Sequence, residues 1–412
     1  MPPNAGRAAE KVARQSYGKL IAFLAARSRD VPAAEDALSE ALASALRVWP
    51  ERGVPGNPEA WLLVAARRNL MQAARHRIVE TNAQTTISVA FEEAEERMNE
   101  AGHAVFPDER LKLLFACTHP AIDRSVHTAL MLQAVLGIEA RTIARAFVVS
   151  PEAMSQRLVR AKVKIRDAGI PFAVPPRPAL AGRLAAVLSA IYAAYGLGWD
   201  GLDGVEEHHL LAGEAIWLGR ALLAMLPDEP EAIGLLSLML HCKARRDSDG
   251  RYVPLDEQDT VAWNAIMIAE ADALLRKAGG FDRFGPFQCQ AAIQSAHAAR
   301  RLSGTTDWQA LTTLYAALVV MKPTLGARVS QAAVIGRASN AAAGLEQLDK
   351  LDPRDVAAYQ PYWAVRAFLL ARTGDDAAAA DAYMAAIGLS DSPAVRDFLA
   401  DRLKEARQAT PG

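Results

Sequence analysis

Residues 139–168 read EARTIARAFVVSPEAMSQRLVRAKVKIRDA and give the clearest indication of the fold class. The apolar residues of this segment recur at intervals of three and four, which is the period of an amphipathic helix and not of a strand. A first short helix is expected over residues 139–147, with Ile143, Ala144 and Phe147 on its buried face. The segment therefore predicts helices packed through one apolar face.

A second helix is expected to follow directly after a turn at residues 148–150. Ser150 is a good N-cap, and Pro151 suits the first helical position, where its missing N–H costs nothing. Beyond Pro151 one helix face is apolar and should be buried; it comprises Met154, Leu158, Ala161 and Ile165. The two helices and their turn predict a helix-turn-helix.

The polar residues of the second helix are arranged as DNA recognition requires. Ser155 and Gln156 lie near its start, and Arg157, Arg160 and Lys164 follow on a face away from the apolar stripe. A recognition helix needs a buried stripe for anchoring, polar residues that reach base edges and cations that meet phosphates. The same pattern also fits a helical hairpin with a solvated basic face, and these residues alone leave both interpretations open.

Outward from this segment, the 412-residue chain shows helical periodicity throughout, so we expect an all-α fold. Its length favours two to four domains. The clearest boundary is the stretch 171–178, which holds four prolines. The expected parts are a first domain (1–80), a linker (81–107), a second domain (108–170), a helical extension (180–300) and a region of helical repeats (305–412).

Charge is segregated although the net charge is only −1. Residues 61–80 hold four arginines against one acidic residue, and residues 141–168 hold seven basic residues against two acidic ones. Between them, residues 80–109 hold eight acidic residues against Arg97. One basic stretch is often a solvated helix face. Two of them, joined by an acidic linker, favour two contacts with one polyanion.

The first basic stretch lies on a helix expected over residues 61–77, after a helix over residues 33–49 and a Pro/Gly-rich loop. Its polar and aromatic residues are Trp61, Arg67, Arg68, Asn69, Arg75 and Arg77. Aromatic and cationic groups together suit unpaired nucleic acid, where bases stack and phosphates need counter-charge. For Trp61 itself, packing in the core is the more common role.

Several classes of protein are disfavoured by what the sequence lacks. Its three cysteines are far apart, which fits a reducing cytoplasm, and no signal peptide is visible. The longest uncharged apolar stretch, residues 184–199, falls short of a membrane span, so we expect a soluble cytoplasmic protein that does not contact a membrane. Zinc-site spacing, a phosphate-binding glycine loop and a nucleophile–base pair are not found, so no enzyme activity, metal or cofactor is expected.

Several motifs together resemble a bacterial extracytoplasmic-function sigma factor. Region two of that family is resembled by residues 34–41 (AEDALSEA), 49–50 (WP), 57–62 (NPEAWL) and 66–69 (ARRN). Region four is resembled by residues 108–111 (DERL), 119–120 (HP), 142–147 (TIARAF) and 157–162 (RLVRAK). The long helical continuation resembles the group of these factors that carries a C-terminal tetratricopeptide-like domain.

The resemblance implies roles for the residues singled out above. Glu35, Asp36, Leu38 and Glu40 would dock on the β′ clamp of core RNA polymerase, and region four would meet its β flap. The −10 promoter element would be captured and melted by the loop from Arg52 to Asn57 and by Trp61, Arg67, Arg68, Asn69, Arg75 and Arg77. The −35 element would be read by Ser155, Gln156, Arg157, Arg160 and Lys164.

The extension contains one stretch with the spacing of a tetratricopeptide repeat, formed by Trp363, Leu370, Gly374, Ala379, Tyr383 and Ala386. Stacked repeats of this kind usually present a concave surface to a protein partner. The expected function is that of a sigma factor whose extension modulates its activity. Two alternatives stay open: a helical-repeat scaffold, and a DNA-binding regulator that works without polymerase.

Overall fold

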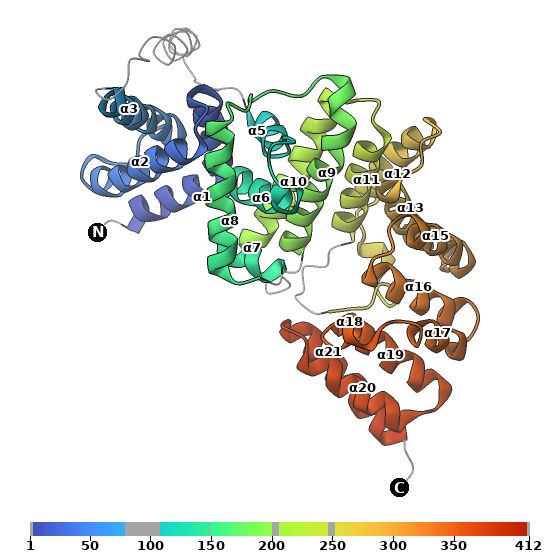
Figure 1. The fold of residues 1–412 in the computed structure, drawn as a ribbon. Helices are drawn as coiled ribbons and strands as arrows, with labels where there is room; N and C mark the ends of the chain where they lie inside the picture. The colour runs from blue at the N-terminus through green and yellow to red at the C-terminus, as the bar shows by residue number, and fades with distance from the viewer. Residues whose placement is uncertain (1–2, 79–107, 148, 200–205, 246–251, 410–412) are drawn as a thin grey trace. The chain divides into compact units, whose positions relative to one another are not determined.

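The computed structural model describes residues 3–78, 108–147, 149–199, 206–245 and 252–409. Throughout these residues the chain forms helices joined by loops and no β-strand (Figure 1), so the expected all-α fold is confirmed. The chain divides into two compact units, residues 1–194 and 195–412. The acidic linker expected at residues 81–107 lies outside the described residues.

The first unit begins with α1 (Pro3–Ser28), α2 (Val31–Arg52) and α3 (Pro58–Ile78), each packed on the next. Helix α2 starts where the Asp30 carboxylate accepts a hydrogen bond from the Ala33 N–H at 3.0 Å. It ends at Arg52, beyond the end at residue 49 that the sequence predicts. Pro50 falls in the last turn, where its missing N–H removes a single helical hydrogen bond.

Helix α1 also packs against α5 (Arg110–Cys117) and α6 (His127–Leu136), which are separated by a short 3-10 helix, η1 (Arg124–Val126). The approach is close because Gly18 of α1 lies against the backbone carbonyl of Val135, where any β-carbon would clash. The helices expected for the first and second domains therefore share one compact unit.

The helices expected at residues 139–168 are present as α7 (Ala140–Ala146) and α8 (Pro151–Asp167). Ile143 and Ala144 are buried as predicted. The prediction that Phe147 faces inward is wrong, because its side chain is 37% exposed. Helix α7 ends at Ala146 and the backbone turns at Phe147, which takes that side chain off the buried face.

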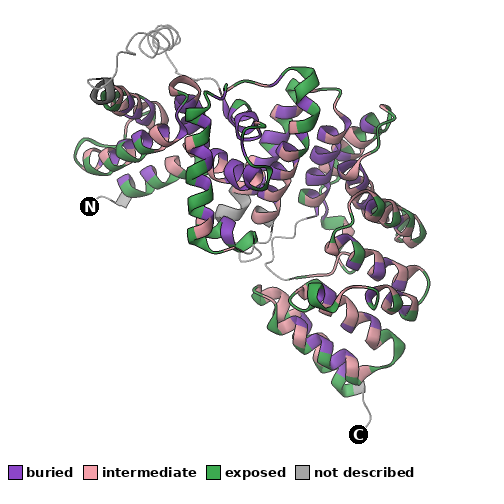
Figure 2. Ribbon diagram, in the orientation of Figure 1, coloured by how far each residue is buried: buried purple, intermediate pink, exposed green. Residues whose placement is uncertain are grey.

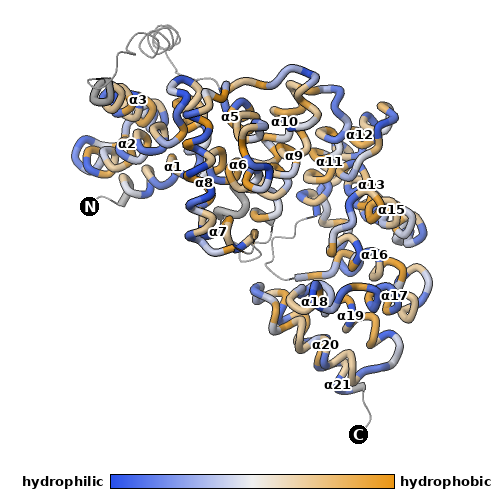
Figure 3. Tube along the Cα trace, viewed as in Figure 1, coloured by the Kyte–Doolittle hydropathy of each residue, from blue (hydrophilic) through white to orange (hydrophobic). Residues whose placement is uncertain are grey.

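Helix α9 (Arg177–Trp199) follows the proline-rich stretch and crosses the boundary between the two units. Within the described residues it is the one helix long and apolar enough to cross a membrane, over Arg177–Leu197. This is weak support for a membrane segment, because 44% of its apolar window is buried in the chain and core helices pass the same test. Figure 3 shows α9 as largely hydrophobic.

The second unit is a succession of helices. In chain order they are α10 (Glu206–Met225), α11 (Pro230–Ala244), η2 (Thr260–Ala262), α12 (Ala265–Gly279), α13 (Pro286–Ala298), α14 (Arg300–Ser303), α15 (Trp308–Met321), α16 (Leu325–Ala338), α17 (Ala341–Leu348), α18 (Pro353–Val356), α19 (Gln360–Thr373), α20 (Asp376–Gly388) and α21 (Pro393–Ala409). From α15 onward each long helix packs mainly on its sequence neighbours, as in a helical-repeat array.

The stretch with repeat-like spacing forms the helix pair α19–α20. Gly374 ends α19 with a φ of 80°, a left-handed conformation that favours glycine. Tyr383 is buried against neighbouring helices, together with Ala379 and Ala386. In the pair before it, a β-carbon on Gly344 would lie 3.0 Å from the Cα of Gly336, so small residues allow these helices to approach closely.

Candidate nucleic-acid interface

Helix α8 is anchored in the first unit by one apolar face. The Ser150 hydroxyl caps the helix by accepting a hydrogen bond from the Ala153 N–H at 3.2 Å. The side chains predicted to be buried are buried: Met154, Leu158, Ala161 and Ile165. Figure 2 shows buried and exposed residues on α8. This packing fixes which side of the helix is left for a ligand.

All five side chains expected to contact the −35 element are exposed on α8, namely Ser155, Gln156, Arg157, Arg160 and Lys164. The Arg160 guanidinium folds along the helix and donates a hydrogen bond to the Gln156 backbone carbonyl at 3.3 Å. Helix α7 adds the exposed cations Arg141 and Arg145 to this region. A DNA duplex could meet polar groups at the helix start and cations farther along.

Acidic groups near this face neutralise part of its charge. Arg141 pairs with Glu139 at 3.3 Å, and Arg166 pairs with Asp167 at 2.8 Å. The pKa of the Asp123 carboxyl is lowered mainly by its hydrogen bond from the Ser125 N–H, with a smaller contribution from Arg157. Asp123 is therefore charged at neutral pH, close to the basic face.

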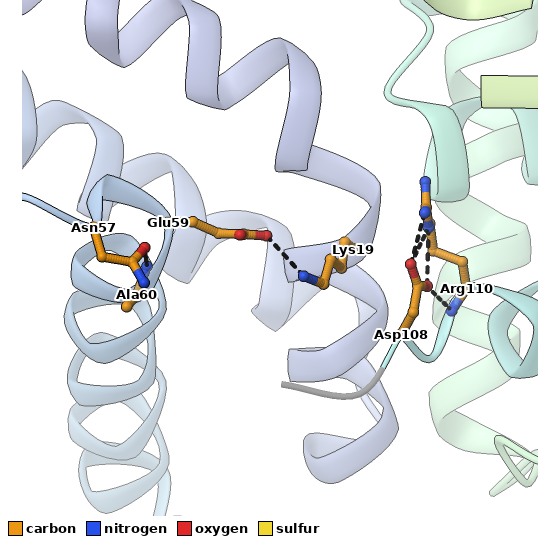
Figure 4. Close-up of polar contacts among 6 residues, drawn as sticks. All are labelled: Lys19, Asn57, Glu59, Ala60, Asp108 and Arg110. Atoms are coloured by element: carbon orange, nitrogen blue, oxygen red, sulfur yellow. Dashed lines mark hydrogen bonds and ion pairs between the residues drawn. The ribbon is translucent and has the colours of Figure 1, made fainter. Parts of the chain in front are cut away.

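The residues expected to bind the −10 element lie around the junction of α2 and α3. Arg52 and Asn57 are exposed. The Asn57 carboxamide oxygen accepts a hydrogen bond from the Ala60 N–H at 3.1 Å, so it caps α3 (Figure 4). Trp61 is half-buried and packs edge-on against Trp49, with ring centroids 5.5 Å apart. Trp61 therefore packs against another aromatic residue, and as a whole residue it remains partly exposed.

Farther along α3 the expected residues have different surroundings. Arg68 is exposed and Arg67 is half-buried. Asn69 donates a hydrogen bond from its side-chain amide to the Ala37 backbone carbonyl at 3.2 Å, which ties α3 to α2. The side chains of Arg75 and Arg77 lie outside the described residues.

The four residues expected to dock on polymerase do not share one surface. Asp36 and Glu40 are exposed on α2, whereas Leu38 is 1% exposed and belongs to the core. Glu35 is half-buried, and its carboxylate lies 2.6 Å from the Lys162 ammonium of α8. Leu38 can therefore affect docking only by holding α2 in place.

The pairing of Glu35 with Lys162 is not among the contacts predicted from the sequence. Lys162 is 7% exposed, although α8 as a whole is basic. Burial raises the pKa of the Glu35 carboxyl, and the attraction of Lys162 opposes that rise. The available signal was the position of Lys162, four residues after Leu158 and therefore beside the apolar stripe.

Two further ion pairs tie down the helix starts in this unit, and Figure 4 shows both. Lys19 of α1 pairs with Glu59 in the first turn of α3 at 3.2 Å. Arg110, at the start of α5, is buried and pairs with the carboxylate of Asp108, which also accepts a hydrogen bond from the Arg110 backbone N–H at 3.0 Å. These contacts brace the scaffold that carries the two basic surfaces.

The fold and the candidate site define an all-α protein whose first unit carries a capped helix, α8, with a buried apolar stripe and exposed basic side chains. Residues 183–279 match a family of unknown function (DUF6596). The chain is also 36% identical over 383 residues to an uncharacterized protein of Rhizobium meliloti (strain 1021), across 91% of this chain and 89% of that protein. It therefore belongs to the same family as the Rhizobium protein. No solved structure matches it.

Proposed function

We propose that this protein is a sigma factor of the extracytoplasmic-function kind, which binds core RNA polymerase and directs it to promoters. The observation that carries the proposal is the exposed face of α8. Its five polar and basic side chains, Ser155, Gln156, Arg157, Arg160 and Lys164, are exposed, whereas the apolar stripe of the same helix is buried. A helix that reads DNA in the major groove needs this division.

The second basic surface supports a second contact with the promoter. Arg52 and Arg68 are exposed, and Trp61 is partly exposed. An aromatic side chain such as Trp61 near the cations Arg52 and Arg68 suits the unpaired bases of a melted −10 element, because bases stack on aromatic rings and phosphates need counter-charge. Exposed Asp36 and Glu40 on the neighbouring helix supply charges for docking on polymerase. Because Glu35 is paired with Lys162, docking through Glu35 would require that pair to open.

The test is transcription in vitro with purified core polymerase and the full chain on a genomic DNA library, with sequencing of the transcript starts. A sigma factor yields discrete starts that share −10 and −35 elements. Arg157→Ala combined with Arg160→Ala should then reduce promoter-directed transcripts at least about tenfold, since both cations face solvent on the proposed reading face. The matched control is Arg276→Ala combined with Arg301→Ala, two exposed arginines of the second unit.

Other outcomes would favour the alternatives. Sequence-selective binding of duplex DNA by the chain alone, without any effect of polymerase, would favour a conventional regulator. No selective binding and no transcript starts would favour a helical-repeat scaffold. A sigma factor works where the polymerase is, so we also propose a cytoplasmic location, which cell fractionation would test.

We further propose that the second unit modulates the first, through a protein partner or by packing on it. The proposal follows from its helical array, in which α15–α21 pack on neighbours as in repeat proteins that bind peptides. The same transcription assay with residues 1–199 tests it. Promoter output equal to that of the full chain would contradict a regulatory role.

A further inference from the structure

The first unit contains a cavity of about 510 Å³ where the end of α5, the start of α6 and the first turns of α9 meet. This volume lies in the range of pockets for small organic molecules. Part of the wall is apolar and includes Pro120, Pro178 and Ala179. The remainder carries Arg124, Arg183 and two histidines, His119 and His127.

No acidic residue is among the described residues that line this cavity. Asp123, which precedes Arg124 in the sequence, is exposed, and its carboxylate accepts a hydrogen bond from the Ser125 N–H at 2.8 Å. The lining therefore combines two permanent positive charges with two imidazoles. A cavity of this kind has a positive potential that favours an anion.

The Arg183 guanidinium is held in place by groups that carry no formal charge. It donates hydrogen bonds to the Phe115 backbone carbonyl and, at 3.3 Å, to the Thr118 hydroxyl. Burial lowers the pKa of Arg183, which is the response of a cation that loses water without gaining a counter-charge. These two hydrogen bonds hold the Arg183 guanidinium in place but supply no negative charge, so none of the described lining residues neutralises it.

The field of Arg183 also acts on the two histidines. Burial lowers the pKa of both His119 and His127, and Arg183 lowers each further, whereas for His127 the hydrogen bond with the Ile122 carbonyl and the field of Asp123 act in the opposite direction. The His119 Nδ1 accepts a hydrogen bond from the Ala121 N–H at 3.2 Å, so its Nε2 carries the proton in the neutral ring. His119 thus adds a donor to the two guanidiniums.

We propose that this cavity is a binding site for a small organic dianion, with its phosphate or paired carboxylates held by Arg124, Arg183 and His119 and its body packed against the prolines. Guanidiniums bind both kinds of anion through paired hydrogen bonds. The ligand would bridge α9 to the loop between α5 and η1. The site goes beyond the proposed role in transcription and does not depend on it.

The experiment is isothermal titration calorimetry on the full chain at neutral pH with ribose 5-phosphate and with succinate, which separate the two sources of the anion. Uncharged ribose is the control ligand. We expect saturable binding of one molecule of at least one anion and no heat of binding from ribose. Because the assay contains no polymerase or DNA, its failure is distinct from failure of the proposed sigma function.

Two variants test the location. Arg124→Gln removes an exposed cation and should weaken anion binding at least about tenfold. Gly182→Leu should fill part of the cavity, and its β-carbon meets no atom within 4 Å. Arg276→Gln, on the exposed face of α12, is the matched control and should bind normally.

The proposal would be overturned by three results. The first is that neither anion binds the wild-type chain. The second is that ribose binds as well as the anions, since the charge would then not be recognised. The third is that Arg124→Gln and Gly182→Leu both bind as the wild type does while circular dichroism shows that they are folded.

Discussion

The Lys162 ammonium of α8 lies 2.6 Å from the Glu35 carboxylate of α2, and both side chains are mostly withdrawn from water, with exposures of 9% and 19%. This pair joins the helix expected to read the −35 element to the helix expected to dock on polymerase. One residue of each proposed binding element is therefore committed to a contact inside the first unit.

Removal of one partner of this pair should destabilise the protein. Lys162→Met leaves Glu35 partly buried without its counter-charge, and we expect a loss of about 3 kcal/mol in the free energy of unfolding at pH 7.5. Urea denaturation followed by circular dichroism measures it. Lys404→Met, which breaks an exposed pair with Asp401, is the control and should have no measurable effect. Equal effects of the two variants on the free energy of unfolding would contradict a stabilising role for the Lys162–Glu35 pair.

The pH dependence of stability should report Glu35. Its pKa is raised above the ordinary 4.5, chiefly by burial, so the folded state keeps this proton where the unfolded chain has lost it. Its contribution to stability is complete below pH 4.5 and is lost as the pH rises through the raised pKa. Glu35→Gln removes this loss, so its stability relative to the wild type should improve as the pH rises above 4.5. A constant difference from pH 4 to pH 8 would contradict this.

Residues at the two ends of α8 should differ in what they contribute to promoter binding. Gln156, near the capped start, is expected to meet base edges, so Gln156→Ala should change the preferred −35 sequence. Lys164, two turns later, is expected to meet phosphate, so Lys164→Ala should weaken binding to all promoters alike and reduce its salt dependence. Selection from a randomised −35 library, repeated at two salt concentrations, measures both. The same shift in preference for both variants would contradict this division.

The close packing of helices in the second unit predicts a large effect of one methyl group. In Gly344→Ala the new β-carbon would lie 2.8 Å from the Ala332 carbonyl oxygen and 2.9 Å from a Leu369 methyl. We expect a loss of about 2 kcal/mol in the free energy of unfolding. Gly213→Ala, in α10, meets no atom within 4 Å and should stabilise its helix by up to about 1 kcal/mol. Urea denaturation measures both variants. A change of the same sign in the free energy of unfolding for both would contradict the prediction.

The proline-rich stretch suggests a domain boundary near residue 175, but a chain that ends there should be less stable than one that ends after α9. A chain ending at residue 175 lacks α9, and with it the Arg183 hydrogen bonds to the Phe115 carbonyl and the Thr118 hydroxyl. A chain ending at residue 199 keeps them. We expect the shorter chain to melt at a lower temperature in a thermal scan followed by circular dichroism. Equal melting temperatures would mean that α9 does not support the end of α5.

The local features of the candidate site were predictable from the sequence. The Ser150 cap, the buried stripe that includes Met154 and Leu158, and the exposed basic face all follow from spacing along one helix. Phe147 was predicted wrongly because helix ends depend on backbone geometry after the last turn, which periodicity does not encode. The roles of Asn57 and Asn69 in capping and bracing were also missed, because an amide can serve either the protein or a ligand.

The all-α fold, the positions of the helices and their basic faces follow from local sequence patterns, because helical periodicity and capping act within a few residues. Which charged groups pair with one another inside the protein depends on the packing of helices that are distant in the sequence. The Glu35–Lys162 pair joins positions 127 residues apart, and the positively charged cavity wall formed by Arg124 and Arg183 draws on segments almost 60 residues apart. Such contacts arise from the packing of distant helices, which no local pattern specifies.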